Sequence, residues 1–443
     1  MRVPQPPRVT MSGRQLLAKW GLPELRGNGR FVSANIMDSL GNGLVLAFTV
    51  IYFTTTTSLS LGSIGAALSV GQFLALPTPV VVGPLIDRYG SRRVVVAANI
   101  VSALGFSGFL AADSVWKIVA VQFVVQAGSS GYWTSSRALV LLAARSDDQA
   151  RWFGFIGALR NIGGGFGVAV ASIAIALDRG GVPVLVLVNA LTFVIAASLM
   201  ASWRPVTGQA APHVPRTESQ AFRTAQGGGY GVVLRDLRYM RLAVANLAFV
   251  LAAAVLPVLL AVYITKVLHA AAWLVGACMV GNMVLVALVQ TLVARTIEHR
   301  RPTWVLALAG VVNAVAFALF GVLLALPGWA VAVGLLPATA VFTLAEMLSL
   351  PSSGELSASL APERIRGRYL GVYQLSWSLG NAVAPALLTM LVGHGAAWPW
   401  VVLGALNLIA VPLVLSVGDS APQDGAQPEP AASGLPAEEG ATS

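Results

Sequence analysis

Charged residues are scarce in this chain of 443 residues. Asp, Glu, Lys and Arg make up 10% of it, whereas 56% of the residues are hydrophobic and the mean hydropathy is +0.76. A soluble domain carries about 25% charged residues, which help to cover its apolar core. The length alone would suggest about three soluble domains. The composition excludes them and indicates a membrane protein.

Residues that hold metals or build redox sites are also rare. Cys278 is the only cysteine, so neither an intrachain disulfide nor a thiolate metal cluster can form. The four histidines are scattered outside the middles of the apolar runs, which removes most zinc or haem sites. The sequence has no GxxxxGK[ST] loop, which argues against direct use of ATP. We therefore expect no cofactor, no metal site, no catalytic residues and no enzymatic activity.

Apolar runs long enough to cross a membrane dominate what is present. A hydrocarbon core of about 30 Å requires roughly 20 helical residues, and the runs lack the two-residue alternation of barrel strands. We expect an all-α polytopic membrane protein with twelve transmembrane helices. The expected spans are 31–54, 61–82, 94–112, 115–142, 152–177, 184–203, 242–264, 271–293, 303–325, 329–352, 368–391 and 397–417.

The basic residues predict the orientation of these spans. The net charge of +10 does not gather on one soluble face, so we expect no nucleic acid partner. Six Lys or Arg residues precede the first span and seventeen occupy the even-numbered connections, against three in the odd-numbered ones. Positive residues concentrate on the cytoplasmic side of membrane proteins. We therefore expect a cell membrane protein with both termini in the cytoplasm.

The longest connection divides the spans into two sets of six. We expect a cytoplasmic N-terminal segment at 1–30, a bundle at 31–203, a cytoplasmic loop at 204–241, a second bundle at 242–417 and a disordered cytoplasmic tail at 418–443. The N-terminal segment lacks the apolar core of a cleaved signal peptide. The loop ends in a basic segment, 234–241, which is either a short helix on anionic lipid or a solvated linker.

The two halves resemble each other in sequence. A shift of 217 residues superimposes 135–163 on 352–380 with seven identities in 29 positions, among them Arg151 with Arg368. Spans four and five therefore repeat as spans ten and eleven. One large class of secondary transporters uses parallel repeats of this kind to build a central site between two rocking halves.

The connection after the second span, 83–93, reads GPLIDRYGSRR. A connection this short must reverse direction at the membrane surface, which explains Gly83 and Gly90 as turn formers. In this position the segment resembles the signature GxLxDRxGR[RK] of the major facilitator superfamily, with Ser91 where a basic residue is usual. The matching positions are Gly83, Leu85, Asp87, Arg88, Gly90 and Arg92.

This resemblance implies a major facilitator fold, in which two six-helix bundles enclose a central cavity. In the family, the loop acts as a cytoplasmic latch. Its charged residues pair with neighbouring helix ends, notably that of helix 11, and hold the outward-open state. The resemblance therefore assigns a conformational role, and not substrate binding, to Gly83, Asp87, Arg88, Gly90 and Arg92.

Two weaker resemblances point to the drug and proton antiporters of this family. Gly163 and Gly167 have the spacing of a helix 5 motif of antiporters, but Val168 replaces its proline, and close helix packing also explains the glycines. The stretch 346–371 resembles the connection between helices 10 and 11 of such antiporters. Helix 4 lacks the family's usual arginine, and we take Gln126 there as a cavity candidate.

Four charged residues lie inside the expected spans, where a charge at the bilayer centre costs about 2.5–3.5 kcal/mol. At 1.5 Å per residue they lie roughly 8–12 Å from the cytoplasmic ends of their helices, in one layer. Two acids and two bases sum to zero, which predicts intramembrane charge partners in a shared polar interior. The four are Asp38, Glu346, Arg137 and Arg160, and Asn246 on the seventh span is a further cavity candidate.

Asp38 and Glu346 are the candidates for proton coupling. Desolvation raises the pKa of a carboxyl, and a nearby arginine lowers it. Opening the cavity or binding a cationic ligand can therefore change whether the carboxyl holds a proton. Structural alternatives stay open. Asp38 could pair with an arginine only to hold its half together, and Glu346 could pair with the inner-loop charges. Arg137 could extend to the interface, and Arg160 could be a structural node.

We expect a secondary transporter that exports small amphipathic organic compounds by proton-coupled alternating access. Its expected partners are the small-molecule substrate, protons and the lipid bilayer, and the chain is expected to act as a monomer. One alternative is a facilitator or symporter that imports a sugar or other metabolite, and another is a non-transporting membrane sensor. Five aromatic residues are expected in interfacial belts, with ligand stacking as the alternative: Tyr52, Trp133, Tyr263, Trp377 and Trp400.

Overall fold

The computed structural model describes residues 23, 25, 27–144, 148–176, 182–205, 229–271 and 273–418. The predictions for residues 1–22, 206–228 and 419–443 lie outside the described residues. Throughout these described ranges the ordered elements are helices, without a strand. The all-α fold is confirmed.

Among the described residues, the first half contains eight helical elements. They are α2 (Gly29–Thr56), α3 (Leu61–Leu74), α4 (Thr78–Tyr89), α5 (Ser91–Gly108), the 3₁₀ turn η1 (Phe109–Ala111), α6 (Val115–Ala143), α7 (Gln149–Ala176) and α8 (Val182–Ser202).

From residue 229 onward, the described part of the second half contains twelve helical elements. They are α10 (Tyr230–Arg235), α11 (Leu237–Ala253), the π-helical η2 (Val255–Leu259), α12 (Leu260–Val262), the π-helical η3 (Tyr263–Val267), α13 (Trp273–Ile297), α14 (Pro302–Val322), η4 (Leu323–Ala325), α15 (Gly328–Ser359), η5 (Glu363–Ile365), α16 (Arg366–His394) and α17 (Trp398–Leu415).

Each of the twelve ranges expected from hydropathy coincides with one helix or with consecutive helices. In the part of the chain that the structure describes, nine helices are long and apolar enough to cross a membrane, or ten if the bent pair α3 and α4 forms one span. α2 and α6, with 28 and 29 residues, also have sufficient length. That all twelve ranges cross the bilayer stays a prediction.

The segment 83–93 differs from its prediction as a loop, because α4 continues to Tyr89. Gly90 makes the reversal between α4 and α5 with φ of 82°, as predicted. Gly83 is not a turn former, since it lies inside α4. A Cβ atom there would come within 2.8 Å of the Gly367 carbonyl oxygen, so the glycine allows close approach of α4 and α16.

The basic segment 234–241 forms the end of α10 and the first turn of α11. α11 begins at Leu237, earlier than the expected residue 242, because Asp236 caps it by accepting a hydrogen bond from the Tyr239 N–H at 3.1 Å. The side chains of Arg235 and Arg241 are exposed. The segment is therefore helical, and its contact with lipid stays a prediction.

Helix contacts repeat between the halves, as the sequence repeat predicts. α5 packs on α6 and on α8, as α14 packs on α15 and on α17, and α2 packs on α7 as α11 packs on α16. A pair of hydrogen bonds repeats as well. Tyr52 donates to the Phe109 carbonyl at 3.1 Å, and Tyr263 donates to the Phe320 carbonyl at 2.5 Å. Each half therefore has the same internal arrangement.

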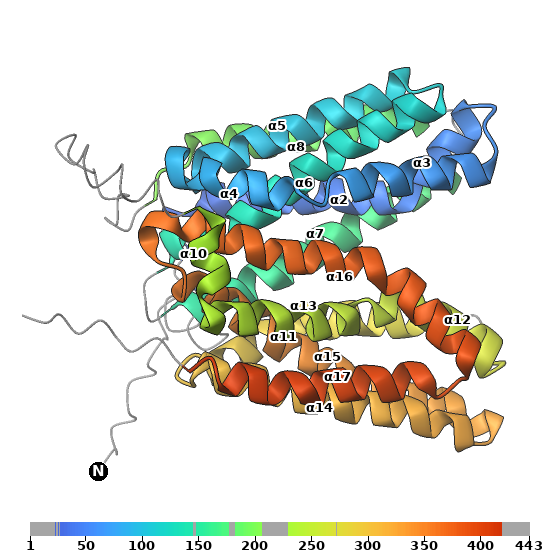
Figure 1. The fold of residues 1–443 in the computed structure, drawn as a ribbon. Helices are drawn as coiled ribbons and strands as arrows, with labels where there is room; N and C mark the ends of the chain where they lie inside the picture. The colour runs from blue at the N-terminus through green and yellow to red at the C-terminus, as the bar shows by residue number, and fades with distance from the viewer. Residues whose placement is uncertain are drawn as a thin grey trace, which may run out of the picture.

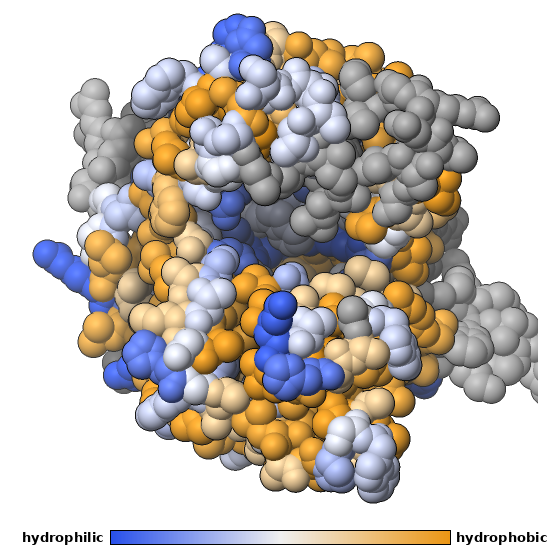
Figure 2. Space-filling view, turned by 90° about the vertical axis from the view of Figure 1, so that its right-hand side faces the viewer, coloured by the Kyte–Doolittle hydropathy of each residue, from blue (hydrophilic) through white to orange (hydrophobic). Residues whose placement is uncertain are grey.

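The two halves contact each other along several helices. α4 and α6 meet α16, and α7 meets α13 and α15, while α6 also meets α15 and α4 meets η5. We call the side where α4 ends and α16 begins the closed side, and it lies at the left of Figure 1. Seen from the opposite, open side, the molecule has a hollow between its halves with hydrophilic residues at the base (Figure 2). The described conformation is therefore open on one side.

The crossing of α2 and α7 yields the first testable prediction. A Cβ atom at Gly43 would lie 2.8 Å from the carbonyl carbon of Gly164. We expect Gly43→Ala to force these helices apart and to lower the melting temperature of the purified protein by about 5 °C. Gly65→Ala is the matched control, because nothing lies within 4 Å of a Cβ atom there. Equal melting temperatures for both variants would contradict the packing.

Candidate functional site

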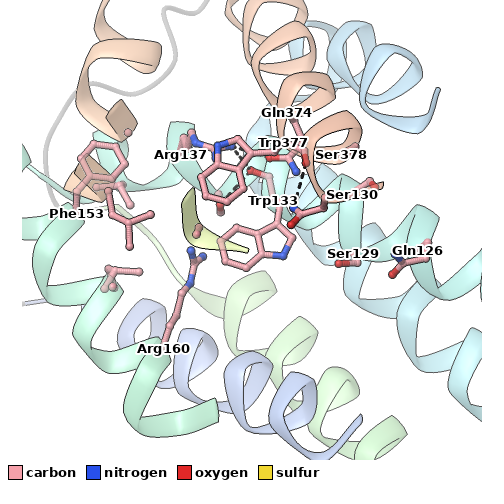
Figure 3. Close-up of a pocket in the computed structure, with 18 of the residues that line it drawn as sticks. Gln126, Ser129, Ser130, Trp133, Arg137, Phe153, Arg160, Gln374, Trp377 and Ser378 are labelled. Atoms are coloured by element: carbon pink, nitrogen blue, oxygen red, sulfur yellow. Dashed lines mark hydrogen bonds between the residues drawn. The ribbon is translucent and has the colours of Figure 1, made fainter. Parts of the chain in front are cut away.

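A cavity of about 680 Å³ lies between the halves. Its walls come from α3, α6 and α7 of the first half and from α11, α15 and α16 of the second (Figure 3). Of the predicted residues, the cavity is lined by Gln126, Arg137, Arg160 and Glu346. The structure therefore brings together both predicted arginines, one predicted acid and the predicted glutamine.

Asp38 lies behind this wall. It is 2% exposed and is not among the residues that line the cavity. Asn42, one turn further along α2, donates to the Asp38 carboxylate at 3.2 Å. The Tyr132 hydroxyl and the Arg160 guanidinium also interact with this carboxylate from α6 and α7. Asp38 thus faces the interior of its own half, and not lipid.

Arg160 joins the surroundings of Asp38 to the cavity. Its Nη2 donates to the Tyr132 hydroxyl at 2.9 Å and to Asn35 Oδ1 at 3.3 Å, and Tyr132 in turn donates to Asn35 Oδ1 at 2.9 Å. The guanidinium carbon lies 4.3 Å from the Trp133 ring centroid. Within the described ranges, no ion pair of 4.0 Å or less joins Asp38 to Arg160. The Tyr132 hydroxyl links the two charges instead.

Arg137 connects the halves across the cavity. From α6, its Nη1 donates to Gln374 Oε1 on α16 at 2.8 Å and to the Trp133 carbonyl at 3.1 Å. Its guanidinium carbon also lies 4.8 Å from the Tyr373 ring centroid, a cation–π distance. The alternative in which Arg137 extends to the membrane interface is therefore wrong.

Glu346 is the acid that lines the cavity. Its Oε2 accepts a hydrogen bond from Asn282 Nδ2 at 2.8 Å, and the same amide donates to Thr343 Oγ1 at 3.0 Å. Among the residues described, Glu346 forms no ion pair with the basic residues of the closed side. Glu346 also lines a smaller cavity of about 20 Å³. Its carboxylate is thus held by neutral groups.

Asn246 lines that smaller cavity and ties α11 to α16. Its Nδ2 donates to Ser376 Oγ at 2.9 Å, and its Oδ1 accepts from the Tyr373 hydroxyl at 2.8 Å. Trp133 and Trp377 line the large cavity, so their expected belt positions are wrong. The sequence alone does not distinguish a belt position from a cavity position for these two tryptophans, because it does not show which faces of α6 and α16 point to the cavity.

Asp87 forms the central contact of the closed side. Its Oδ1 accepts a hydrogen bond from the Gly367 N–H at 2.6 Å, and its Oδ2 lies 3.6 Å from Nε of Arg368. Tyr230 of α10 donates its hydroxyl proton to the carbonyl of Val80 on α4. Burial raises the pKa of this tyrosine to about 12, so it stays a donor at physiological pH.

The other predicted latch residues do not cross between the halves. Arg92 Nη1 donates to the Trp203 carbonyl at 2.6 Å and anchors α5 to the end of α8 within the first half. Arg88 is exposed, with its guanidinium 5.2 Å from the ring centroid of Tyr89. The contact between the halves in this segment is therefore made by Asp87 and by the glycine at 83.

A second ion pair closes the same side. Arg151 at the start of α7 donates through Nε and Nη2 to the two carboxylate oxygens of Glu298, with Nη2 2.6 Å from Oε1. The side chain of Glu298 is 4% exposed. Glu298 directly follows the end of α13, and Asp87 has a similar place in the last turn of α4. Sequence reasoning missed this pair. The repeat that aligns Arg151 with Arg368 was the signal that could have found it.

The described residues contain no group of three or more His, Cys, Asp and Glu residues that could hold a metal ion. The cavity instead offers two guanidinium groups, one carboxylate and neutral amides and hydroxyls. These groups can bind a polar or charged organic molecule. Nothing in this arrangement pairs a nucleophile with a base.

Comparison with known proteins identifies the family. The family model described as Major Facilitator Superfamily matches residues 31–349 and 242–440. The chain therefore belongs to the Major Facilitator Superfamily of membrane transporters, and it is not an enzyme.

Two curated relatives and one solved structure illustrate the range of this similarity. The chain is 24% identical to the Na⁺, Li⁺, K⁺/H⁺ antiporter of Planococcus maritimus, over 83% of the chain and 90% of the antiporter. It is also 24% identical to the multidrug resistance protein MdtH of Cronobacter sakazakii, over 84% and 90%. The proton:xylose symporter XylE has the same fold, with a TM-score of 0.70 at 13% identity over 91% and 97% of the two chains.

The two ion pairs of the closed side predict a measurable opening. We expect Asp87→Asn and Arg151→Gln each to increase the population with a separated closed side, since each removes one contact between the halves. Spin labels at Tyr89→Cys and Glu363→Cys, in a Cys278→Ala background, would report this by pulsed electron resonance. Asp113→Asn is the control, because its partner Lys117 lies one turn away at the open side. Unchanged distances in both variants would refute the role of these pairs.

Proposed function

We propose that this transporter is a proton-coupled exporter of small amphipathic organic compounds that works by alternating access. The observation that carries the proposal is a cavity with charged and polar side chains in its lining, between two repeated bundles that are in contact at the closed side. One chain supplies both walls of the cavity, so the proposed transporter acts as a monomer. Rocking of the halves would close the open side and expose the cavity on the other.

The proposed conformational residues lie on the closed side. Asp87 and Arg151 of the first half hold Arg368 and Glu298 of the second, so both contacts must break when that side opens. Gly83 permits the backbone approach, Gly90 makes the turn, and Arg92 anchors α5 to the end of α8. Arg88 is proposed to act in the conformational change from its exposed position beside Tyr89. In this proposal the pairs stabilise the described conformation and do not bind substrate.

The proposed proton-coupling residues are Asp38 and Glu346. Glu346 reaches both cavities, where an arriving substrate or water changes its surroundings. Asp38 senses the cavity through Arg160 and Tyr132, which link it to the wall. A carboxyl whose solvation and charge environment differ between the two open states binds a proton on one side and releases it on the other.

Export is proposed because similar proteins carry names that describe it. MdtH is named a multidrug resistance protein, and the relative from Planococcus maritimus is named a cation/H⁺ antiporter. A second candidate is proton-coupled import. Import is favoured by the two arginines in the cavity, which can bind an anionic substrate. Protonation of a neighbouring acid would strengthen the binding of that anion, so the proton and the substrate would move in the same direction. The sign of the flux under an imposed pH gradient distinguishes these candidates.

Substitution of the two acids tests the coupling. We expect Asp38→Asn and Glu346→Gln to reduce proton-driven flux in proteoliposomes by about tenfold or more, which corresponds to about 1.4 kcal/mol. Exchange of substrate without a gradient should be less affected, because it does not require proton release. Asp113→Asn serves as the control, since this acid is exposed at the open side. Normal gradient-driven flux in Asp38→Asn or Glu346→Gln would remove that residue from the mechanism.

The proposed orientation places the closed side in the cytoplasm of a cell membrane protein. Arg30, Arg92 and Arg300 lie at helix ends on that side, whereas Lys117 and Lys266 lie at helix ends on the open side. Reporter fusions at residue 210 and after residue 443 should therefore both score as cytoplasmic. An external score at either position would contradict the proposed topology.

A further inference from the structure

The large cavity is lined by more positive than negative side chains. The charged side chains are Arg137, Arg160 and Glu346, so the described lining carries two positive groups and one negative group. Asp38 lies behind the wall and is linked to Arg160 through Tyr132, without an ion pair of 4.0 Å or less. The surface that a ligand touches therefore has a positive excess.

The carboxylate in this lining is already engaged. Glu346 accepts a hydrogen bond from Asn282 at 2.8 Å, and Asn282 fixes it against Thr343 on the wall of the second half. Arg160 has hydrogen-bond donors that are not used within the described residues. Its hydrogen bonds are made by Nη2, while its buried Nε–H meets no acceptor in the described part of the chain. Arg160 therefore has hydrogen-bonding capacity that its contacts within the described protein do not use.

Aromatic rings surround the two guanidinium groups. Trp133 lies against Arg160 at 4.3 Å, and Trp377 and Phe153 line the same cavity. Figure 3 shows Arg160 directed into the space beside Trp133, with Arg137 and Trp377 on the other side of that space. An aromatic body would therefore find ring faces next to the positive groups.

We infer that the substrate carries a carboxylate or sulfonate on an aromatic body, with its oxyanion held by Arg160 and Arg137. Guanidinium groups bind oxyanions through charge-assisted, paired hydrogen bonds. Neutral donors on the same walls, such as Gln126 and Asn161, would complete the shell around the oxyanion. This substrate class rests on the proposed transport through the cavity and is independent of its direction.

Binding of a matched set of ligands tests this inference. The probes are 2-naphthoate, 2-naphthamide and 2-naphthylmethylammonium, which share one ring system and differ in charge. Binding to the purified full chain in nanodiscs of zwitterionic lipid is measured with labelled 2-naphthoate and by competition. We expect the carboxylate to bind at least about tenfold more tightly than the amide, and the ammonium not to compete.

Variants assign the binding to the cavity. We expect Arg160→Gln and Arg137→Gln each to weaken 2-naphthoate binding by about tenfold, and Glu346→Gln to leave it equal or tighter, since a negative charge is removed. Arg93→Gln is the matched control, because this arginine is exposed at the start of α5. Size-exclusion profiles of all variants show whether each is folded, and the two arginine variants act at different helices.

Two results would overturn the inference. One is failure of 2-naphthoate to bind the wild-type protein. The other is binding of the ammonium probe that is lost in Glu346→Gln and kept in Arg160→Gln. Failure of the proposed transport gives a different pattern, namely normal binding of 2-naphthoate with no flux in proteoliposomes. Flux of a cationic compound that survives Arg160→Gln would support transport and contradict the anionic substrate.

Discussion

The contact between α4 and α16 is the constraint on which the rest of the structure depends. Gly83 and Gly367 let two backbones approach where any larger residue would collide. This approach allows the Asp87 carboxylate to accept a backbone hydrogen bond from the other half. With the halves held together there, they diverge on the open side and leave room for a polar cavity. Small residues thus determine the state that the molecule adopts.

Inside the cavity, polar linkers separate the charges instead of pairing them. Tyr132 and Asn35 link Arg160 to the region of Asp38, and Asn282 holds Glu346. A direct ion pair would keep each charge compensated and unavailable to a ligand. Linked through neutral groups, the side chains remain responsive to a ligand or a proton, which is what the proposed coupling requires.

Hydropathy and charge distribution predicted the helical ranges, the division into halves and the membrane location, because lipid demands long apolar helices. The residues that line the cavity were harder to predict. Arg137 and Trp377 could be assigned to the cavity only after the rotation of α6 and α16 was known. Gly83 was misread for a similar reason, since sequence does not show that α4 continues past it. The ion pair of Arg151 with Glu298 could be predicted only by applying the alignment of the two repeats to the contacts of Asp87 and Arg368.

The two ion pairs of the closed side are arranged reciprocally. The first half contributes the acid Asp87 and the base Arg151, and the second contributes the base Arg368 and the acid Glu298. Separation of the halves consequently leaves each with one charge of each sign. No net charge from these four groups moves relative to the membrane, so the transmembrane voltage does no net work on their opening. Voltage sensitivity of transport is therefore expected from charges other than these two pairs, such as those of the cargo and the cavity.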